Sequence, residues 1–514
     1  MRKKFIRNKK TRYAVVSVAL TVMVIVVAVL SNAVLASLVQ RYSLYAYMTP
    51  TQAFGVSEDC FTLLDESFGT DKATKVEIIF CDLEKNVKSD DSPNYYLYYT
   101  ACELAERYPS IQLKFLDIFS NPAPVKPYTE SVNPLTGEKV KTSLTSDSVI
   151  VVSGEYHRVY NWPEFYVFEN EEASEPWAYN GEKKLSAALL RAVDTDPQIV
   201  CLLSNHGEVF YDYELLTLLD DAGYTIVYID LFKEAIPDNC SMIISYNPNS
   251  DLITDSLSQI SETEILDRFL EEEGHSFFVF LENGTPNLPN FEAYLKTWGV
   301  ETEYAQNATT GVSYRYMVQD PQHSLTSDGY TIYGEAIAET AVDHLLDPNA
   351  KYVVFSNATA LSVTTEGYTD QHNGSYRSMS GKRTLYPLYQ SSASSLAWAN
   401  GTVVDGGNSI LMSLTEQTNE KGSSYVGVVA SVNFSAKNFL QSAVYHNGDV
   451  LFHLFDVVGE QSTPAGLTIK PFASYDISTI TTAQMLRWTV ALALIPAVSI
   501  LTAAIIVLIK RRRA

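Results

Sequence analysis

Four consecutive residues combine side chains that could perform chemistry: Asn205, His206, Gly207 and Glu208. A histidine can donate or accept a proton near neutral pH, and a glutamate near the start of a helix is stabilised by the helix dipole. No nucleophile stands at this turn, because Cys201 lies four residues before Asn205, inside an expected strand. The alternative is a structural turn, in which Gly207 permits a tight bend and Glu208 helps to cap the following helix. We therefore predict no catalytic residue here, and we retain the four residues as candidates for binding a small ligand.

The rest of the sequence lacks the short motifs that usually identify an enzyme. It contains no P-loop, dinucleotide-binding, nucleophile-elbow or zinc-protease motif, and its five cysteines form no C-x-x-C pair. The acidic pair Asp220-Asp221 lies at helix positions that we expect to face solvent, so it does not indicate a hydrolytic dyad. Cys81, Cys201 and Cys240 lie in or beside apolar runs, where a free cysteine behaves as a small buried hydrophobe. We predict a protein that is not an enzyme and that uses no cofactor and no metal.

The candidate turn belongs to a region, residues 196–480, in which strand-like and helical segments alternate. The strand-like segments are Ile199–Leu203, Thr225–Asp230, Met242–Ser245 and Ser276–Leu281, and the helical ones are Tyr211–Ala222, Glu262–Glu272 and Phe291–Trp298. This alternation predicts a flavodoxin-like or amidotransferase-like domain, in which helices cover both faces of a parallel sheet. The pattern becomes irregular after Thr302, although Val426–Phe434 is expected to return to the sheet as a late strand. Ligands of such sheets collect at the carboxyl ends of the strands, where the turn lies.

Residues 40–195 predict a separate thioredoxin-like α/β domain without the redox cysteines. Its expected strands are Lys75–Cys81, Gln112–Ile118, Ser148–Ser153 and Tyr156–Tyr160, and its expected helices are Tyr95–Tyr108 and Glu182–Val193. The stretch Pro122–Thr145 is rich in Pro, Thr and Ser and predicts an exposed loop.

Both ends of the chain carry an uncharged apolar run flanked by basic residues. The runs at residues 13–39 and 488–509 are each long enough for a transmembrane helix, which needs roughly 20 residues. Basic tails at residues 1–12 and 510–514 favour cytoplasmic termini, so we expect a two-pass protein of the plasma membrane with a large extracytoplasmic domain. A cleaved signal peptide is the alternative interpretation of the first run, because Ala33–Ala36 loosely resembles a cleavage site. The predicted fold class is α/β: a membrane-anchored ectodomain with the two domains above and one transmembrane helix at each end.

The charge distribution argues against one class of partner. The formal net charge of the chain is −23, from 37 basic and 60 acidic residues. The two tails hold 11 of the basic residues and none of the acidic ones, which leaves 26 basic against 60 acidic residues, a net charge of −34, in between. A region this acidic repels nucleic acid, so we predict no nucleic-acid partner, and we predict contact with the lipid bilayer through the two spans.

Two stretches of the chain resemble the GldG family, whose members are auxiliary components of ABC transporters related to the gliding-motility system. They are EKKLSAALLRAVDTDPQIVCLLSNHGE (Glu182–Glu208) and GYTIVYIDLFKEAIPDNCSMIISYNP (Gly223–Pro248). The family pattern is a helix, a strand, a G-H-G-E turn, a helix and a strand that ends in an acidic residue. This chain has Asn205 in place of the first Gly of the turn, and Gly274-His275 in place of a later Gly-Gly. The resemblance implies an ABC permease and a separate cytoplasmic ABC ATPase as partners.

We therefore expect a non-enzymatic auxiliary subunit of an ABC transporter complex, whose extracytoplasmic domain binds substrate, cell-envelope material or partner proteins. Two alternatives stay open: a membrane-anchored hydrolase or amidotransferase-like enzyme, and a structural cell-envelope protein. An aligned nucleophile and base at the strand ends would favour the enzyme.

Overall fold

A computed structural model describes residues 55–69, 74–132, 139–141, 143–169, 173–208, 213–255, 259–306, 313–442, 444–459, 463–464 and 466–472. The predicted transmembrane segments, 13–39 and 488–509, and the basic tails lie outside these residues, so their prediction stays a prediction. Within the described ranges, no helix combines the length and the apolar character needed to cross a membrane.

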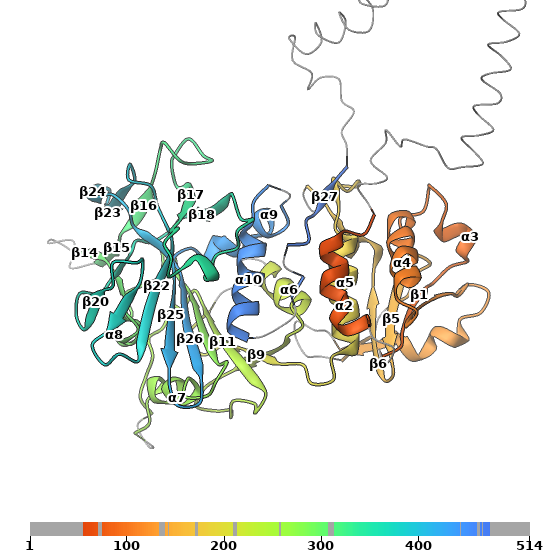
Figure 1. The fold of residues 1–514 in the computed structure, drawn as a ribbon, viewed down its shortest axis with the longest axis horizontal. Coiled ribbons are helices and arrows are strands. Elements are labelled where there is room, and N and C mark those ends of the chain that lie inside the picture. Colours follow the sequence, from red (N-terminus) through yellow and green to blue (C-terminus); the bar gives the residue numbers. More distant parts are fainter. Residues whose placement is uncertain are drawn as a thin grey trace, which may run out of the picture. The chain divides into compact units, whose positions relative to one another are not determined.

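Residues 55–193 form an α/β region around a four-stranded sheet (Figure 1). Its elements are α2 (Glu58–Phe68), β1 (Val76–Phe80), α3 (Glu84–Val87), α4 (Tyr95–Arg107), β2 (Ile111–Phe115), η2 (Ala123–Thr129), β3 (Glu130–Val132), β4 (Lys139–Lys141), β5 (Val149–Ser153), β6 (Tyr156–Tyr160), η3 (Trp162–Phe165), β7 (Tyr166–Val167), β8 (Ala178–Tyr179) and α5 (Gly181–Val193). In the order β2-β1-β5-β6, β1 is parallel to β2 and antiparallel to β5. The stretch predicted as an exposed loop contains η2 and the β3–β4 hairpin.

Residues 199–306 supply four neighbouring parallel strands of a larger, 13-stranded sheet. The elements are β9 (Ile199–Leu203), α6 (Glu214–Asp221), β10 (Thr225–Ile229), β11 (Cys240–Tyr246), α7 (Glu262–Phe269), β12 (Ser276–Phe280), α8 (Pro289–Thr297), β13 (Val300–Thr302) and β14 (Tyr304–Gln306). The strands β10, β9, β11 and β12 are neighbours in that order and all parallel, and the four predicted strands of this stretch are confirmed.

The remaining described residues are mostly short strands. They form β15 (Ser313–Arg315), β16 (Met317–Gln319), β17 (Thr331–Ala336), η4 (Asp343–Leu345), β18 (Val353–Ser356), β19 (Leu361–Val363), β20 (Tyr368–Asp370), β21 (Tyr376–Ser378), β22 (Arg383–Gln390), β23 (Leu396–Ala399), β24 (Thr402–Gly406), β25 (Ile410–Thr418), β26 (Ser423–Val429), η5 (Val432–Ser435), α9 (Lys437–Leu440), α10 (Asn447–Gly459) and β27 (Lys470–Pro471). The predicted late strand is confirmed, because β26 pairs parallel to β12.

The predicted fold class is wrong. The chain does not join a thioredoxin-like domain to a parallel-sheet domain; the described residues form a mixed α/β fold with several sheets, and the largest sheet is itself mixed. Beyond β26 its main path continues antiparallel through β25, β22, β17 and β18 (Figure 1). The reason lies in the connections: β25 ends at Thr418 and β26 begins at Ser423. A parallel pair needs a crossover of about a dozen residues, so this short link forces an antiparallel pair.

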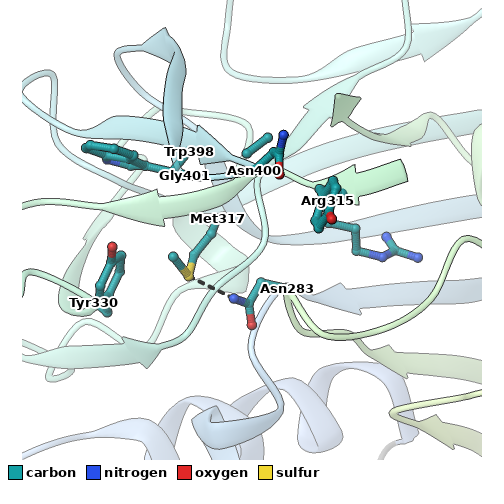
Figure 2. A pocket seen from close by; sticks show the side chains of 9 residues that line it. Asn283, Arg315, Met317, Tyr330, Trp398, Asn400 and Gly401 are labelled. Atoms are coloured by element: carbon teal, nitrogen blue, oxygen red, sulfur yellow. Dashed lines mark hydrogen bonds between the residues drawn. The ribbon is translucent and has the colours of Figure 1, made fainter. Parts of the chain in front are cut away.

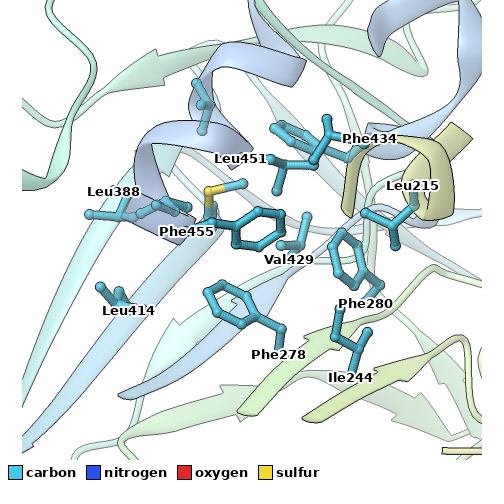
Figure 3. Close-up of a cluster of buried hydrophobic side chains, with 14 of the residues drawn as sticks. Leu215, Ile244, Phe278, Phe280, Leu388, Leu414, Val429, Phe434, Leu451 and Phe455 are labelled. Carbon is cyan, nitrogen blue, oxygen red and sulfur yellow. The ribbon is translucent and has the colours of Figure 1, made fainter. Parts of the chain in front are cut away.

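Side chains alternate between the two faces of the parallel strands, as the two-residue period of a strand requires. On β12, Phe278 and Phe280 enter one hydrophobic core, whereas Phe277 and Val279 enter the other. Figure 3 shows the first core, where the ring of Phe278 meets that of Phe455 from α10 edge to face, with 5.7 Å between ring centroids. Residues of α6 and α10 belong to this core, and residues of α7 and α8 to the other. The two cores fix the strand ends that carry the candidate site.

The prediction that Asp220-Asp221 faces solvent is wrong. Asp220 is only 5% exposed and forms an ion pair with Arg158 on β6. Asp221 accepts a hydrogen bond from Nζ of Lys184 on α5, at 2.5 Å. Helix α6 has α5 and α9 as neighbours, which cover the face that a pattern from α6 alone would leave to solvent. These two pairs tie the four-stranded region to the larger sheet.

The predicted burial of Cys81, Cys201 and Cys240 is confirmed, and all three thiols are free. Burial raises the pKa of the Cys81 thiol to about 11. It therefore stays protonated at neutral pH, in keeping with a role in packing.

Candidate functional site

The Asn205–Glu208 turn follows β9 at its carboxyl end, as the sequence predicts. Because β10 and β11 flank β9 on opposite sides, this end is a point where the strand order reverses, the position at which open α/β sheets bind ligands. Gly207 has φ of 70°, which confirms that it permits the tight bend. The crevice is occupied by the chain itself: the N–H groups of Asn249 and Ser250, just after β11, both donate to the carbonyl of His206 at 2.8 Å.

The side chain of His206 lies between two carboxylates. His206 is 1% exposed, and its Nε2 lies 3.0 Å from Oε2 of Glu262, the first residue of α7. Its Nδ1 lies 3.3 Å from Oε1 of Glu208. Glu262 is fully buried and accepts two further hydrogen bonds, from Nδ2 of Asn205 and from the N–H of Ile253, each at 2.8 Å. Three segments of the chain, the 205–208 turn, the loop at Ile253 and the start of α7, therefore meet at one buried ion cluster.

The Glu208 carboxylate binds within the turn itself. Helix α6 begins at Glu214, and the Glu208 carboxylate accepts the backbone N–H of its neighbour His206 at 2.9 Å. The Glu208 carboxylate thus interacts with the backbone of the turn and with the imidazole of His206.

Electrostatics hold the cluster in its charged form. Burial by itself lowers the pKa of His206, but its contacts with Glu208 and Glu262 outweigh burial and raise the pKa to about 9. Burial raises the pKa of Glu262, and its hydrogen bonds, first that from His206, outweigh this and lower the pKa. The imidazole is thus protonated at neutral pH, and a protonated ring has no lone pair to act as a general base. The geometry suits a structural role, in which the ion pairs of His206 with Glu208 and Glu262 form a clasp that holds the β9 turn against α7.

A pH titration should expose this clasp. His206 has a folded pKa near 9 against an ordinary value of 6.5, so its contribution to stability is complete below pH 6.5 and disappears as pH rises through 9. Between pH 6 and pH 10 we expect the free energy of unfolding to fall by about 2–3 kcal/mol more in the native chain than in His206→Gln. Equilibrium urea unfolding at both pH values, followed by tryptophan fluorescence, measures the difference. Equal pH dependence in the two proteins would contradict a protonated His206.

A second cluster brings together a serine, a histidine and an aspartate. Oγ of Ser394 lies 3.4 Å from Nδ1 of His323, and Oδ1 of Asp320 lies 3.6 Å from the same nitrogen. In a nucleophile–base–acid relay the two ring nitrogens take different partners. Here Ser394 donates directly to Asp320 at 3.2 Å, and Ser392 also hydrogen-bonds that carboxylate. The buried Asp320 accepts hydrogen bonds from both serines. The cluster therefore does not align Ser394 as a nucleophile with His323 as its base.

A cavity of about 380 Å³ lies near the carboxyl end of β12 (Figure 2). Its walls come from the segment after β12, from β15 and β16, from the residue before β17, and from the β23–β24 hairpin. The lining residues are Asn283, Tyr314, Arg315, Met317, Tyr330, Trp398, Ala399, Asn400 and Gly401. This site is not predictable from local sequence patterns, because its residues are spread over more than a hundred positions. One available signal was Asn400-Gly401, a dipeptide typical of tight hairpins.

The walls of this cavity are fixed by local structure. Met317 and Trp398 are cross-strand partners on β16 and β23. The next turn is a two-residue hairpin, because Ala399 pairs with Thr402, and Asn400 takes the left-handed φ of 51° that such turns require. Nδ2 of Asn283 donates to Sδ of Met317 at 2.8 Å. Strand pairing and this hydrogen bond thus position aromatic and amide side chains around one space.

Within the described residues, no group of three or more His, Cys, Asp and Glu side chains is arranged to hold a metal ion.

Comparisons with known proteins add little. No protein-family model matches the chain, and no curated protein matches it. A solved structure described as "mmIFT52 N-terminal domain" is similar over 51% of this chain and 97% of its own, with 13% sequence identity and a TM-score of 0.34. A likeness at this level carries no argument about fold or function.

Proposed function

We propose that this protein is a non-enzymatic auxiliary subunit of an ABC transporter complex, with a large extracytoplasmic domain that binds substrate or a partner. The resemblance of Glu182–Glu208 and Gly223–Pro248 to the GldG family supports this proposal. The sequence also lacks a P-loop, so ATP hydrolysis would belong to a separate cytoplasmic subunit and transport to a permease.

The structural observation that supports binding best is the cavity beside Asn283. Aromatic and amide side chains line it, and no lining residue that the structure describes is a Ser, Thr, Cys, His, Asp or Glu. Such a lining offers contacts to a ligand without the side chains that most often act as nucleophile or general base. The hydrolase alternative would need an aligned pair of these groups, and the cluster of Ser394, His323 and Asp320 does not supply one.

The proposed location is the plasma membrane, with spans at residues 13–39 and 488–509 and both termini in the cytoplasm. The basic tails and the acidic region between the spans support this arrangement. Contact with the bilayer would then fall to the spans, and the net charge of the region between them disfavours nucleic acid as a partner.

Labelling of intact cells with a membrane-impermeant maleimide tests this topology. Four of the five native cysteines are buried, and Cys102 is partly exposed. The variant Cys102→Ser is therefore expected to show little labelling of native cysteines. In that background we expect Lys126→Cys, at an exposed position in η2, to be labelled from outside. A cysteine appended after Ala514 should be labelled only after the cells are permeabilised. Labelling of the appended cysteine in intact cells, or protection of Lys126→Cys, would contradict the proposed topology.

A further inference from the structure

The walls of the cavity beside Asn283 present both ring faces and unsatisfied polar groups. Figure 2 shows Trp398, Tyr330 and Met317 among the side chains that line the cavity, with the thioether of Met317 hydrogen-bonded to Asn283. Tyr314, a third aromatic residue of the lining, is 37% exposed. These residues offer flat apolar surface to whatever enters.

Several polar groups at the walls have no protein partner. Among the described residues, no hydrogen bond engages Oδ1 of Asn283, the side-chain amide of Asn400, or the hydroxyls of Tyr314 and Tyr330. Each can donate or accept a hydrogen bond, or do both. A ligand that supplies several hydroxyl groups would satisfy them together.

Charge narrows the choice of ligand. The only charged residue of the described lining is Arg315, which is 4% exposed. Its Nη2 donates to Glu292 at 2.8 Å, and its Nε donates to the carbonyl of Thr285 at 2.8 Å. Because its guanidinium is buried and paired with a carboxylate, it attracts an anion less than an unpaired cation would. Its Nη1 has no hydrogen-bond partner among the described residues and offers one more donor to an oxygen of a ligand. No lining carboxylate would attract a cation either.

We infer that this cavity binds a short segment of an uncharged saccharide. The C–H faces of pyranose rings pack on aromatic rings, and their hydroxyls match the free groups of Asn283, Asn400, Tyr314 and Tyr330. The volume of about 380 Å³ is near the lower end of the range of about 300–1,000 Å³ for ligand pockets, which suits one or two sugar rings. The inference rests on the proposed function for its extracytoplasmic setting, since the same chemistry occurs in free oligosaccharides and in the glycan of a cell envelope.

Titration of the purified full-length chain with two neutral disaccharides, cellobiose and N,N′-diacetylchitobiose, tests this inference. Because maltoside detergents carry a disaccharide, the chain is kept in a polyoxyethylene detergent. We expect saturable binding of at least one probe, seen as a change in tryptophan fluorescence and as saturation transfer from protein to sugar protons. Glucose 6-phosphate should bind no better than glucose, because the one cation of the described lining, Arg315, is already paired with Glu292.

Two variants locate the binding site. Tyr314→Ala and Trp398→Leu should each weaken binding of the disaccharide roughly tenfold by removing a stacking surface. The matched control is Tyr352→Ala, because Tyr352 is 52% exposed and does not line the cavity. It should bind as the native chain does. Should Trp398→Leu fail to fold, the partly exposed Tyr314 still decides the question.

A suspension of purified cell-wall glycan distinguishes the two possible sources of the saccharide, which are the cell envelope and free oligosaccharides. Depletion of the protein by the suspension, reversed by the soluble disaccharide, assigns the ligand to the envelope; soluble binding without depletion assigns it to free oligosaccharides. Absence of binding to every saccharide probe, or equal binding by the native chain and both cavity variants, would overturn the inference. Neither result concerns assembly with transporter subunits. The proposed function is tested separately, by co-purification of those subunits.

Discussion

Replacing Glu262 by alanine is expected to lower the free energy of unfolding by about 3–5 kcal/mol, because it removes one partner of a buried ion pair. The substitution leaves the protonated His206 with Glu208 alone, and it deprives Asn205 and the N–H of Ile253 of their acceptor. Burial prevents water from replacing these contacts, since Glu262 is 0% exposed. Equilibrium urea unfolding of the full chain measures the loss.

Two further variants distinguish the loss of the buried ion pair from the smaller loss of stability that any change at the start of a helix can cause. Glu264 lies two residues later in the first turn of α7 and takes part in a capping box with Ser261. Glu264→Ala should therefore cost only about 0.5–2 kcal/mol, the usual value of a lost cap. Glu262→Gln retains an acceptor and should fall between the two alanine variants. Equal losses in Glu262→Ala and Glu264→Ala would show that the cluster around His206 adds nothing beyond the cap.

Lys184→Ala is expected to destabilise the chain by a similar amount, about 3–5 kcal/mol, by leaving the largely buried Asp221 without its partner. The exposed fraction of the side chain is 5% for Lys184 and 16% for Asp221, and the neighbouring Asp220 is buried. Two neighbouring carboxylates would then share Arg158 as their remaining cation. Because Lys184 is on α5 and Asp221 on α6, the loss weakens the tie between the four-stranded region and the larger sheet.

An exposed ion pair provides the control for this prediction. Lys421 pairs with Glu272, and more than half of each side chain is exposed. Lys421→Ala should change the free energy of unfolding by about 0–1 kcal/mol, because water screens the pair. The double variant Lys184→Met with Asp221→Leu should recover most of the loss, since an apolar pair often replaces a buried ion pair at little cost. A loss in Lys184→Ala no larger than in Lys421→Ala would contradict the account of this contact.

The sequence predicts those parts of the fold in which local pattern and tertiary role agree. Strands such as Ile199–Leu203 are short apolar runs between helical segments, and the parallel order of the sheet follows from that alternation. The sequence does not predict most of the antiparallel half, because its long strands β22 and β25 are each buried at several consecutive positions and therefore show no clear period of two. Without that period, Ser-, Thr- and Gly-rich strands resemble loops.

The candidate site was predictable only in its local component. The position of His206 after a strand and the bend at Gly207 follow from neighbouring residues. Its main partner, Glu262, lies 56 residues away, and only the packing of α7 brings the two together. The same limit explains the error at Asp220: helical spacing shows which face of α6 is polar, but not that Arg158 and α5 cover that face.

The proposal that this chain serves an ABC transporter is tested most directly by its partners in the membrane. The native full-length chain carrying an affinity tag would be extracted in mild detergent, purified, and its companions identified by mass spectrometry. Replacing residues 13–39 and 488–509 with unrelated transmembrane segments shows whether the spans contribute to assembly. The account predicts that an ABC permease and an ABC ATPase co-purify with the native chain, in reduced yield when the spans are replaced. Recovery of the native chain in full yield without either subunit would contradict it.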